Sequence, residues 1–382
     1  MRIAQIAPIA ERVPPKKYGG TERVIYHLTE ELVRLGHEVT LFASGDSRTS
    51  GKLVSVVPRS LREMSEKDIY GFNHHSMLNV GLAYSMQDQF DIIHDHNPHM
   101  GLPTANISET PVVTTWHGPY NREISRYFGL LNRTHLVSIS KSQAALAHDL
   151  KFVGNVYNGL DMKRYPFSDT PKDYMLFVGR IDAEKGVHLA CDTAVRLGKK
   201  LVIAAKLDDQ VPHIREYFEK EIRPRFEARP DLLQWIGEVD EASRNELMKN
   251  ALCLLHAVTW PEPFGLTLIE SMACGCPVIA FNRGSIPEVI VDGKTGFVVE
   301  NVDQMVRAVK KIAAIDRAYC RKYSIETFSA TRMARGYEAI YKKVVDAKRR
   351  GQSRPQNQEE SINDSKRQKL FLGFGSSGNQ TA

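Results

Sequence analysis

The sequence has few cysteines and no long apolar run. Its 382 residues include five cysteines, an odd number that is spread thinly from residue 191 onward. Because secreted proteins rely on paired cysteines, we expect reduced thiols and a cytoplasmic location. No apolar stretch approaches the roughly 20 residues of a membrane-spanning helix, so no membrane span is predicted. Residues 1–7 lack the cationic start of an export signal and instead predict a first β-strand.

An excess of charge of one sign is also missing. The 51 Lys and Arg residues against 45 Asp and Glu residues give a net charge of +6, which disfavours a nucleic-acid binder. Seven basic and three acidic residues follow from Lys348 onward, so the rest of the chain is nearly neutral. Residues 351–382 are rich in Gln, Asn, Ser, Gly and Arg, and we expect a disordered, solvated tail there rather than an anion-binding signal.

Several signatures of common function classes are absent. No Gly-x-Gly-x-x-Gly follows the first predicted strand, which disfavours a dinucleotide-dependent oxidoreductase, and no Walker-type loop is present. Cys274 and Cys276 have too few partners nearby for a zinc site. Residues 94–99, His-Asp-His-Asn-Pro-His, could supply zinc or iron ligands. Because this run follows a strand and enters a proline-broken loop, we expect it to line a cleft instead.

What the sequence does contain is a regular alternation of strand-like and helix-like segments. The helical spacing of residues 21–35 ends at Gly36, a typical C-terminal residue. This alternation predicts an α/β fold of two Rossmann-like domains that face each other across a cleft. The predicted strands are 2–7, 38–43, 90–94, 111–115 and 136–139 in the first half, then 174–178, 200–204, 232–236, 252–256, 277–281 and 296–298 in the second.

The turn Asn158-Gly159-Leu160-Asp161, followed by Pro166, separates the two halves. We therefore expect a first domain over residues 1–158 and a second over 159–330. Residues 331–350 are expected to form a C-terminal helix that packs back toward the first domain.

Two glycine-containing segments could bind phosphate. Gly19-Gly20-Thr21-Glu22 begins the first long helix, where free backbone amides attract an anion, although an ordinary turn explains the glycines equally well. Gly179-Arg180 and Lys185-Gly186 follow the strand that opens the second half. An Arg fork beside a Lys point charge can neutralise a diphosphate, and the alternative is a solvated loop with two surface cations.

The third segment, residues 262–270, carries two glutamates eight residues apart. Glu262 lies in a loop that contains Pro263 and Gly265, and Glu270 lies about one turn into the helix that follows. A carboxylate at that place can accept hydrogen bonds from vicinal hydroxyls, as on a ribose, and each is worth roughly 1.5–3 kcal/mol. Helix capping by Glu270 is the alternative, but it does not explain Glu262 and the glycine together.

Together these motifs resemble the retaining nucleotide-sugar glycosyltransferases of the GT-B architecture, and specifically their large family 4. The Glu262 and Glu270 pair is similar to the E-x7-E signature of that family, and residues 179–186 are similar to its diphosphate-binding loop. Residues 19–22, 158–161, 284–288 and 292–296 are similar to further family segments. The resemblance covers about residues 1–347 in the expected order.

The resemblance implies a role for each candidate residue. Arg180 and Lys185 would hold the leaving diphosphate, Glu262 the donor sugar and Glu270 the ribose. His117 follows a predicted strand, where a packing role is usual, but its match to a family histidine implies contact with the donor sugar. Asp95 and His96 would face the acceptor. The implied catalytic residues are His117, Arg180, Lys185 and Glu262, and the donor-binding residues are Gly19, Gly20, Val239, Phe264, Gly265, Leu266, Thr267 and Glu270.

The expected activity is transfer of a hexosyl unit from a nucleotide-diphosphate sugar with retention of anomeric configuration and without a metal or other cofactor. Fixed cations would stabilise the leaving group, and no Asp-x-Asp dyad is present. The sequence does not choose between UDP, GDP and ADP donors, and a UDP-hexose is slightly favoured. The acceptor, whether glycan, lipid or small molecule, is left open, as is the oligomeric state. The alternatives are an isomerase or phosphorylase of the same architecture, or a non-catalytic nucleotide-sugar-binding module.

Overall fold

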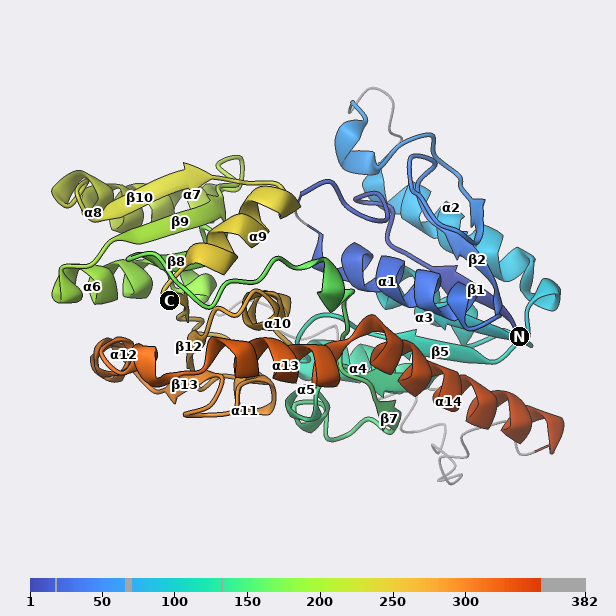
Figure 1. Cartoon of the computed structure of the whole chain (residues 1–382). Helices are drawn as coiled ribbons and strands as arrows, with labels where there is room; N and C mark the ends of the chain where they lie inside the picture. Colours follow the sequence, from blue (N-terminus) through green and yellow to red (C-terminus); the bar gives the residue numbers. More distant parts are fainter. Residues whose placement is uncertain (18, 66–70, 132, 352–382) are drawn as a thin grey trace, which may run out of the picture.

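The chain forms two lobes, each built around a parallel β-sheet with helices on both faces (Figure 1). The computed structural model describes residues 1–17, 19–65, 71–131 and 133–351. This confirms the predicted fold class of two Rossmann-like α/β domains. The predicted tail lies outside the described residues apart from Gly351.

The first sheet has, within the described residues, seven strands in the order β3-β2-β1-β4-β5-β6-β7. The order reverses between β1 and β4, and Ile3 pairs with Val39 on one side and Ile92 on the other. Ligands of such sheets bind beyond the carboxyl ends of the strands at this reversal. The strands are β1 Arg2–Ile6, β2 Glu38–Phe42, β3 Lys52–Val54, β4 Ile92–Asp95, β5 Val112–Thr115, β6 His135–Ser138 and β7 Phe152–Asn155.

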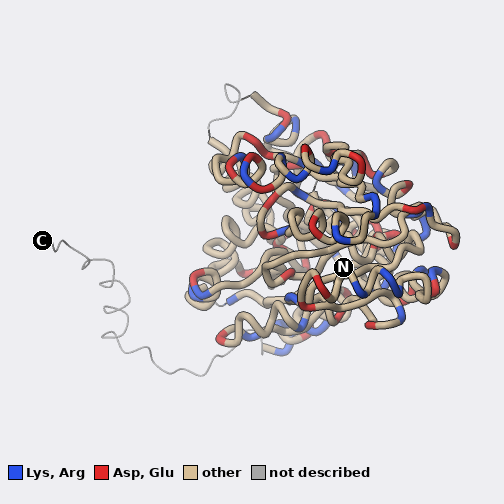
Figure 2. Tube along the Cα trace, turned by 90° about the vertical axis from the view of Figure 1, so that its left-hand side faces the viewer, with Lys and Arg blue, Asp and Glu red and all other residues tan. Residues whose placement is uncertain are grey.

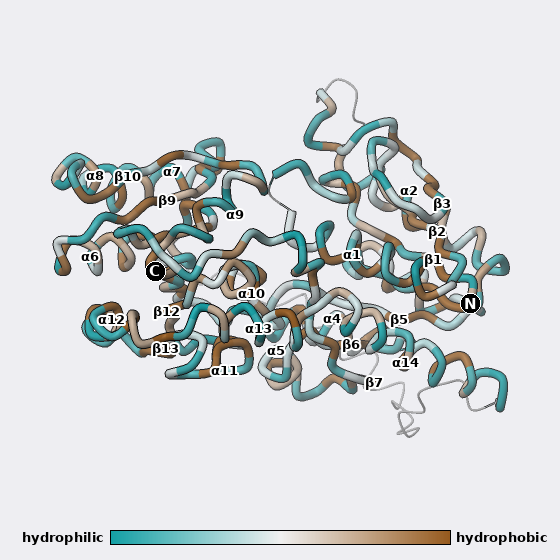
Figure 3. The backbone as a smooth tube through the Cα atoms, viewed as in Figure 1, coloured by the Kyte–Doolittle hydropathy of each residue, from teal (hydrophilic) through white to brown (hydrophobic). Residues whose placement is uncertain are grey.

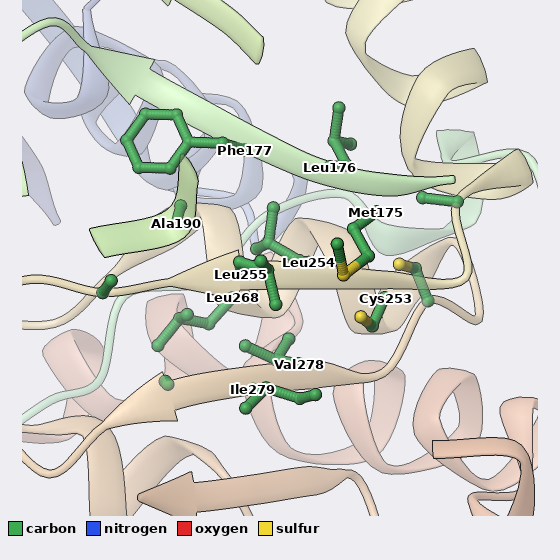
Figure 4. Close-up of a cluster of buried hydrophobic side chains, with 14 of the residues drawn as sticks. Met175, Leu176, Phe177, Ala190, Cys253, Leu254, Leu255, Leu268, Val278 and Ile279 are labelled. Atoms are coloured by element: carbon green, nitrogen blue, oxygen red, sulfur yellow. The ribbon is translucent and has the colours of Figure 1, made fainter. Parts of the chain in front are cut away.

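The second sheet repeats this design with six strands among the described residues, in the order β10-β9-β8-β11-β12-β13. Its order reverses between β8 and β11. Apolar residues of β8, β11 and β12 meet in a continuous core, to which Leu268 and Ala190 add from the covering helices (Figure 4). The strands are β8 Met175–Arg180, β9 Leu201–Lys206, β10 Leu233–Gly237, β11 Cys253–His256, β12 Val278–Phe281 and β13 Gly296–Val299.

Hydrophobic and hydrophilic residues alternate along the helices (Figure 3), and the apolar ones are largely buried. In α1, for example, Val24, Ile25, Leu28 and Leu32 are buried on one face, as a 3.6-residue period requires. The α-helices are α1 Gly20–Arg34, α2 Phe72–Ser85, α3 Pro98–Ala105, α4 Arg122–Leu130, α5 Lys141–Ala145, α6 Val187–Leu197, α7 Pro212–Tyr217, α8 Arg223–Ala228, α9 Glu241–Asn250, α10 Leu266–Ala273, α11 Ile286–Val289, α12 Val302–Val309, α13 Arg317–Phe328 and α14 Ala330–Arg349.

Two connections join the lobes, and they touch each other. The chain crosses from the first lobe to the second after β7 and returns between α13 and α14. Where they meet, Leu160 N donates to Phe328 O at 3.0 Å and Ala330 N donates to Leu160 O at 2.9 Å. A Cβ at Gly159 would lie 2.4 Å from Ser329 O, so this contact admits glycine alone. The turn that the sequence shows at residues 158–161 is therefore a close crossing of two chain segments.

The last helix, α14, leaves the second lobe and packs against the first (Figure 1). Its residues Tyr337, Tyr341, Val344 and Val345 are buried with apolar residues of α1 and of the first sheet. Part of the core of the first lobe therefore comes from the far end of the chain.

The sequence located most strands but not the two edge strands of the first sheet. β3 has three residues and shows no alternation, and β7 contains Gly154, which weakens the strand pattern. Each of these two strands pairs with a strand that the sequence did predict, β3 with β2 and β7 with β6. The first sheet was therefore recognisable without them.

The surface of the described residues carries both signs of charge intermixed (Figure 2). None of the helices in the described ranges combines the length and apolar character needed to cross a bilayer.

Candidate active site

A cavity of about 420 Å³ lies between the two lobes. It opens where the carboxyl ends of the strands at both order reversals face each other, because residues after β1, β8 and β11 line it. The residues that line it include all those predicted to be catalytic or donor-binding, namely His117, Arg180, Lys185, Glu262, Gly19, Gly20, Val239, Phe264, Gly265, Leu266, Thr267 and Glu270. The structure thus brings together side chains that the sequence spreads over some 250 positions, and their roles stay predictions.

Glu262 is held by three side chains on one of its oxygens. Lys185 Nζ and Trp260 Nε1 each donate to Oε2 at 2.9 Å, and His256 Nε2 lies 3.8 Å from the same atom. Burial would raise the pKa of Glu262, but the Lys185 ammonium and His256 outweigh it and lower the pKa to about 2. Glu262 is therefore ionised, and among the described residues both of its side-chain hydrogen bonds are made through Oε2 rather than Oε1.

The backbone around Glu262 is fixed by residues 284 and 285. Ser285 N donates to Glu262 O at 2.9 Å. Gly284 has φ +61°, and a Cβ there would lie 2.3 Å from the same carbonyl oxygen. This contact explains the glycine in the segment 284–288, since any side chain would push the Glu262 loop out of place.

Glu270, on α10, is buried and accepts three hydrogen bonds on one oxygen. Arg23 Nη1 donates to Oε1 at 2.7 Å, Arg244 Nη2 at 2.8 Å and the Tyr165 hydroxyl at 3.1 Å. Two guanidinium groups therefore compensate the buried carboxylate. Among the described residues all three hydrogen bonds use Oε1, and none of them uses Oε2.

The first turn of α10 offers backbone amides to an anion. Gly265 precedes the helix with φ +82°, and no side chain caps it. The first amides of a helix have no intrahelical acceptor, and they carry the positive end of the helix dipole. A phosphate beside Leu266 and Thr267 would accept hydrogen bonds from these free amides.

The cavity carries a positive balance of charge. Arg180 stands at the end of β8, with one guanidinium nitrogen 3.5 Å from Asp182. Burial raises the pKa of Glu22 to about 7, which reduces its negative charge at neutral pH. Seven basic side chains face five acidic ones, a difference that suits a diphosphate. They are Lys17, Arg23, Arg62, Arg180, Lys185, Lys206 and Arg244 against Glu11, Glu22, Glu238, Glu262 and Glu270.

The two glycines at the start of α1 have close protein neighbours, Gly19 within its own lobe and Gly20 across the junction. Gly19 has φ +144°, and a Cβ there would meet Pro15 at 2.7 Å. A Cβ at Gly20 would lie 3.3 Å from Leu266 Cδ1, so the starts of α1 and α10 are in contact across the junction. Both glycines also line the cavity, so their predicted contact with a donor stays a prediction.

His117 lies at the cavity end of a buried chain of hydrogen bonds. Its Nε2 is 2.9 Å from His96 Nδ1, and His96 Nε2 is 2.8 Å from Gln5 Oε1. Gln5 Nε2 donates to the Tyr341 hydroxyl of α14 at 3.1 Å. Burial lowers the pKa of His117 to about 4. His117 is therefore a neutral imidazole of fixed orientation at neutral pH.

The backbone beside His117 is also held from α5. Gln143 Nε2 donates to Trp116 O at 2.8 Å and to Gly118 O at 2.7 Å, which are the carbonyls on either side of His117. In turn, Glu288 of the second lobe accepts hydrogen bonds from the backbone of Lys141 and Ser142 at the start of α5. Both lobes therefore contribute to the position of His117.

The placement expected for Asp95 and His96 is wrong. Asp95 is fully buried, accepts from Asn97 N at 2.7 Å and from the Tyr84 hydroxyl at 3.2 Å, and does not line the cavity. His96 is buried behind His117. Residues at the end of a parallel strand can point back into the fold, and the strong packing of β4 on both sides favours this. They support the site rather than face the acceptor.

The residues that hold Glu270 were not found from the sequence, namely Arg23 and Arg244, which line the cavity, and Tyr165 behind them. Their contacts join segments 26 to 247 residues apart, and no local motif marks them. His256 and Trp260 immediately precede Glu262, so their position beside the motif was the available signal.

Two family models match the chain in succession. Residues 18–164 match the model described as Glycosyltransferase Family 4, and residues 161–327 match Glycosyl transferases group 1. The junction between the two matches falls at the crossing of the two connections.

The chain is also similar to characterised proteins over most of its length. It is 25% identical over 350 residues to a glycogen synthase of Mycobacterium tuberculosis, covering 76% of this chain and 81% of the relative. It is 26% identical over 344 residues to a phosphatidyl-myo-inositol mannosyltransferase of Mycolicibacterium smegmatis, covering 83% and 86%. The fold matches that of Anabaena HepE, solved with UDP and glucose, with a TM-score of 0.69, 16% identity and coverage of 90% and 100%. The chain is a glycosyltransferase of the GT-B type, composed of a Family 4 domain followed by a group 1 domain.

Proposed function

We propose that the chain transfers a hexosyl unit from a nucleotide-diphosphate sugar, with UDP as the favoured nucleotide, to an acceptor hydroxyl with retention of anomeric configuration. The observation that carries this is the meeting of Arg180, Lys185 and the uncapped start of α10 on one side of a cavity that Glu262 and Glu270 also line. The solved structure of HepE with UDP and glucose supports the same donor class for this site.

In the proposed reaction the bond between the anomeric carbon and the diphosphate breaks, and a bond forms from that carbon to the acceptor oxygen. Negative charge grows on the diphosphate, where Arg180, Lys185 and the α10 amides are already in place to stabilise it. The leaving phosphate oxygen accepts the proton of the acceptor hydroxyl on the same face of the sugar. These fixed positive groups supply the electrostatic stabilisation without a divalent metal.

Glu262 and His117 position the donor sugar in this scheme. Glu262 stays ionised because its pKa is about 2, so it accepts hydrogen bonds from sugar hydroxyls through Oε1. His117 is neutral and offers one ring nitrogen, because the other contacts His96. Neither side chain needs to exchange a proton during the transfer. Closure of the lobes over both substrates would exclude water from the cavity.

The test is a screen of nucleotide release from UDP-, GDP- and ADP-sugars in the presence of a chelator, which needs no knowledge of the acceptor. We expect slow hydrolysis of one class, with the first-formed free sugar in the anomeric form of the donor by proton NMR. Binding without release across a broad acceptor panel would favour a non-catalytic module. Formation of a sugar phosphate that depends on added inorganic phosphate would favour a phosphorylase, and release of a free sugar epimer would favour an isomerase.

A further inference from the structure

One arginine of the first lobe contacts two carboxylates of the second. Arg23, in the second turn of α1, is buried, and its Nη1 donates to Glu270 Oε1 at 2.7 Å. Its Nε lies 3.6 Å from Glu241 Oε2, at the start of α9. Its Nη2 donates to the backbone carbonyl of Lys17 at 3.2 Å, within its own lobe. The side chain is therefore anchored in one lobe and bound to the other.

These contacts depend on how the lobes are arranged. The starts of α1 and α10 meet at Gly20 and Leu266, and Arg23 lies three residues beyond Gly20. A rotation that separated the two helices would part Arg23 from Glu270 before it disturbed either sheet. The ion pair at 2.7 Å thus depends on the two lobes being close together.

The guanidinium groups beside Glu270 also have unused donors. The Nε atoms of Arg23 and Arg244 are buried and, among the described residues, have no hydrogen-bond acceptor. Both arginines line the cavity. Buried donors are normally satisfied, so two unsatisfied ones on side chains that line one cavity favour a ligand with acceptor oxygens there.

We propose that Arg23 is a positioning residue that couples nucleotide binding to closure of the two lobes. It holds Glu270 through Oε1 and leaves Oε2 for the ribose, while its Nε stays beside Glu241 Oε2. This inference rests on the proposed function, because it takes the ligand to be a nucleotide. A ligand that binds the closed arrangement more tightly than the open one must favour closure. By linkage, loss of the contact between Arg23 and Glu270 must then weaken binding of that ligand.

The test compares Arg23→Ala and Arg23→Gln with Arg34→Ala, a control on the same helix whose side chain is exposed and pairs with Glu31. The Gln variant keeps most of the side-chain volume and removes the charge, so it serves if the Ala variant does not fold. Nucleotide affinity is measured by calorimetry with UDP, ADP and GDP. Closure is measured as the change in radius of gyration by X-ray scattering when the nucleotide that binds is added.

We expect the full chain to bind one nucleotide and to become more compact. Both Arg23 variants should bind it roughly 10- to 100-fold more weakly, the range for one charged hydrogen bond, and should lose the compaction. Arg34→Ala should behave as the unchanged chain. Unaltered affinity in folded Arg23 variants, or weaker affinity with full compaction, would overturn the coupling while the proposed function stands. Absence of nucleotide binding in the unchanged chain would instead reject the proposed function itself.

Discussion

Replacement of Lys185 by Met tests the electrostatics of the cavity most directly. Lys185 has two neighbours there, the Glu262 carboxylate at 2.9 Å and the Trp260 ring at 4.3 Å. In the proposed reaction it is also one fixed donor to the leaving diphosphate. Loss of one such donor costs about 10²–10³ in turnover. We therefore expect Lys185→Met to lower kcat by that factor at saturating donor.

The same change should reduce stability in a pH-dependent way. The pKa of Glu262 is lowered from 4.5 to about 2, which corresponds to about 3 kcal/mol, shared between Lys185 and His256. Because the pKa is lower in the folded chain, this contribution is fully present above pH 4.5 and is lost as the pH falls toward 2. At pH 7 the variant should lose part of this stability, and its difference from the unchanged chain should shrink below pH 4.5.

A double variant separates the two effects. In the single variant Lys185→Met the buried Glu262 carboxylate has lost its ion-pair partner. Adding Glu262→Gln removes that charge, so urea unfolding should show that stability is recovered. The turnover of the double variant should still be low. Lys220→Met is the control, since Lys220 is exposed and pairs with Glu216 on its own helical segment. Unchanged kcat in folded Lys185→Met with saturating donor would refute the role of Lys185 in stabilising the leaving group.

Three further predictions follow from the cavity. Glu270→Ala should mainly weaken nucleotide binding, and an unaltered affinity by calorimetry would contradict the ribose assignment. Gln143→Glu removes both hydrogen bonds to the carbonyls beside His117. We expect kcat to fall about 10-fold or more, as for a misplaced catalytic group, while nucleotide affinity is kept. Equal kinetics would show that Gln143 does not position His117. Gly284→Ala should destabilise the chain by about 1–3 kcal/mol in urea unfolding, because its backbone is left-handed and abuts Glu262; an unchanged midpoint would show that this loop adapts freely.

The fold could be predicted from the sequence because each central strand is a short apolar run rich in β-branched residues. Val112–Thr115 and Val278–Phe281 are buried along their whole length, and such runs signal a parallel sheet. The edge strands β3 and β7 of the first sheet gave no such signal, because β3 has three residues and β7 contains Gly154. Chain order and helix spacing then leave few topologies open.

The candidate site was predictable where its residues lie within one loop, and not where they meet across the junction. Glu262 and Glu270 share one motif, and the loop from Arg180 to Lys185 follows one strand. Arg23 and Glu270 are 247 residues apart in the sequence, and their pairing depends on how two helices from different lobes approach. The error at Asp95 has the same origin, since the direction in which a side chain leaves a strand end is set by the packing around it.

The position of α14 has a consequence for how this polypeptide folds during synthesis. Tyr337 and Tyr341 complete the apolar interior of the lobe that is made first, although they leave the ribosome more than 170 residues after the last strand of that lobe. Until then the nascent first lobe exposes the groove along α1 that these tyrosines fill. A fragment that stops at residue 158 would keep that apolar groove uncovered, and co-expression of the separate helix in trans should improve its recovery in soluble form.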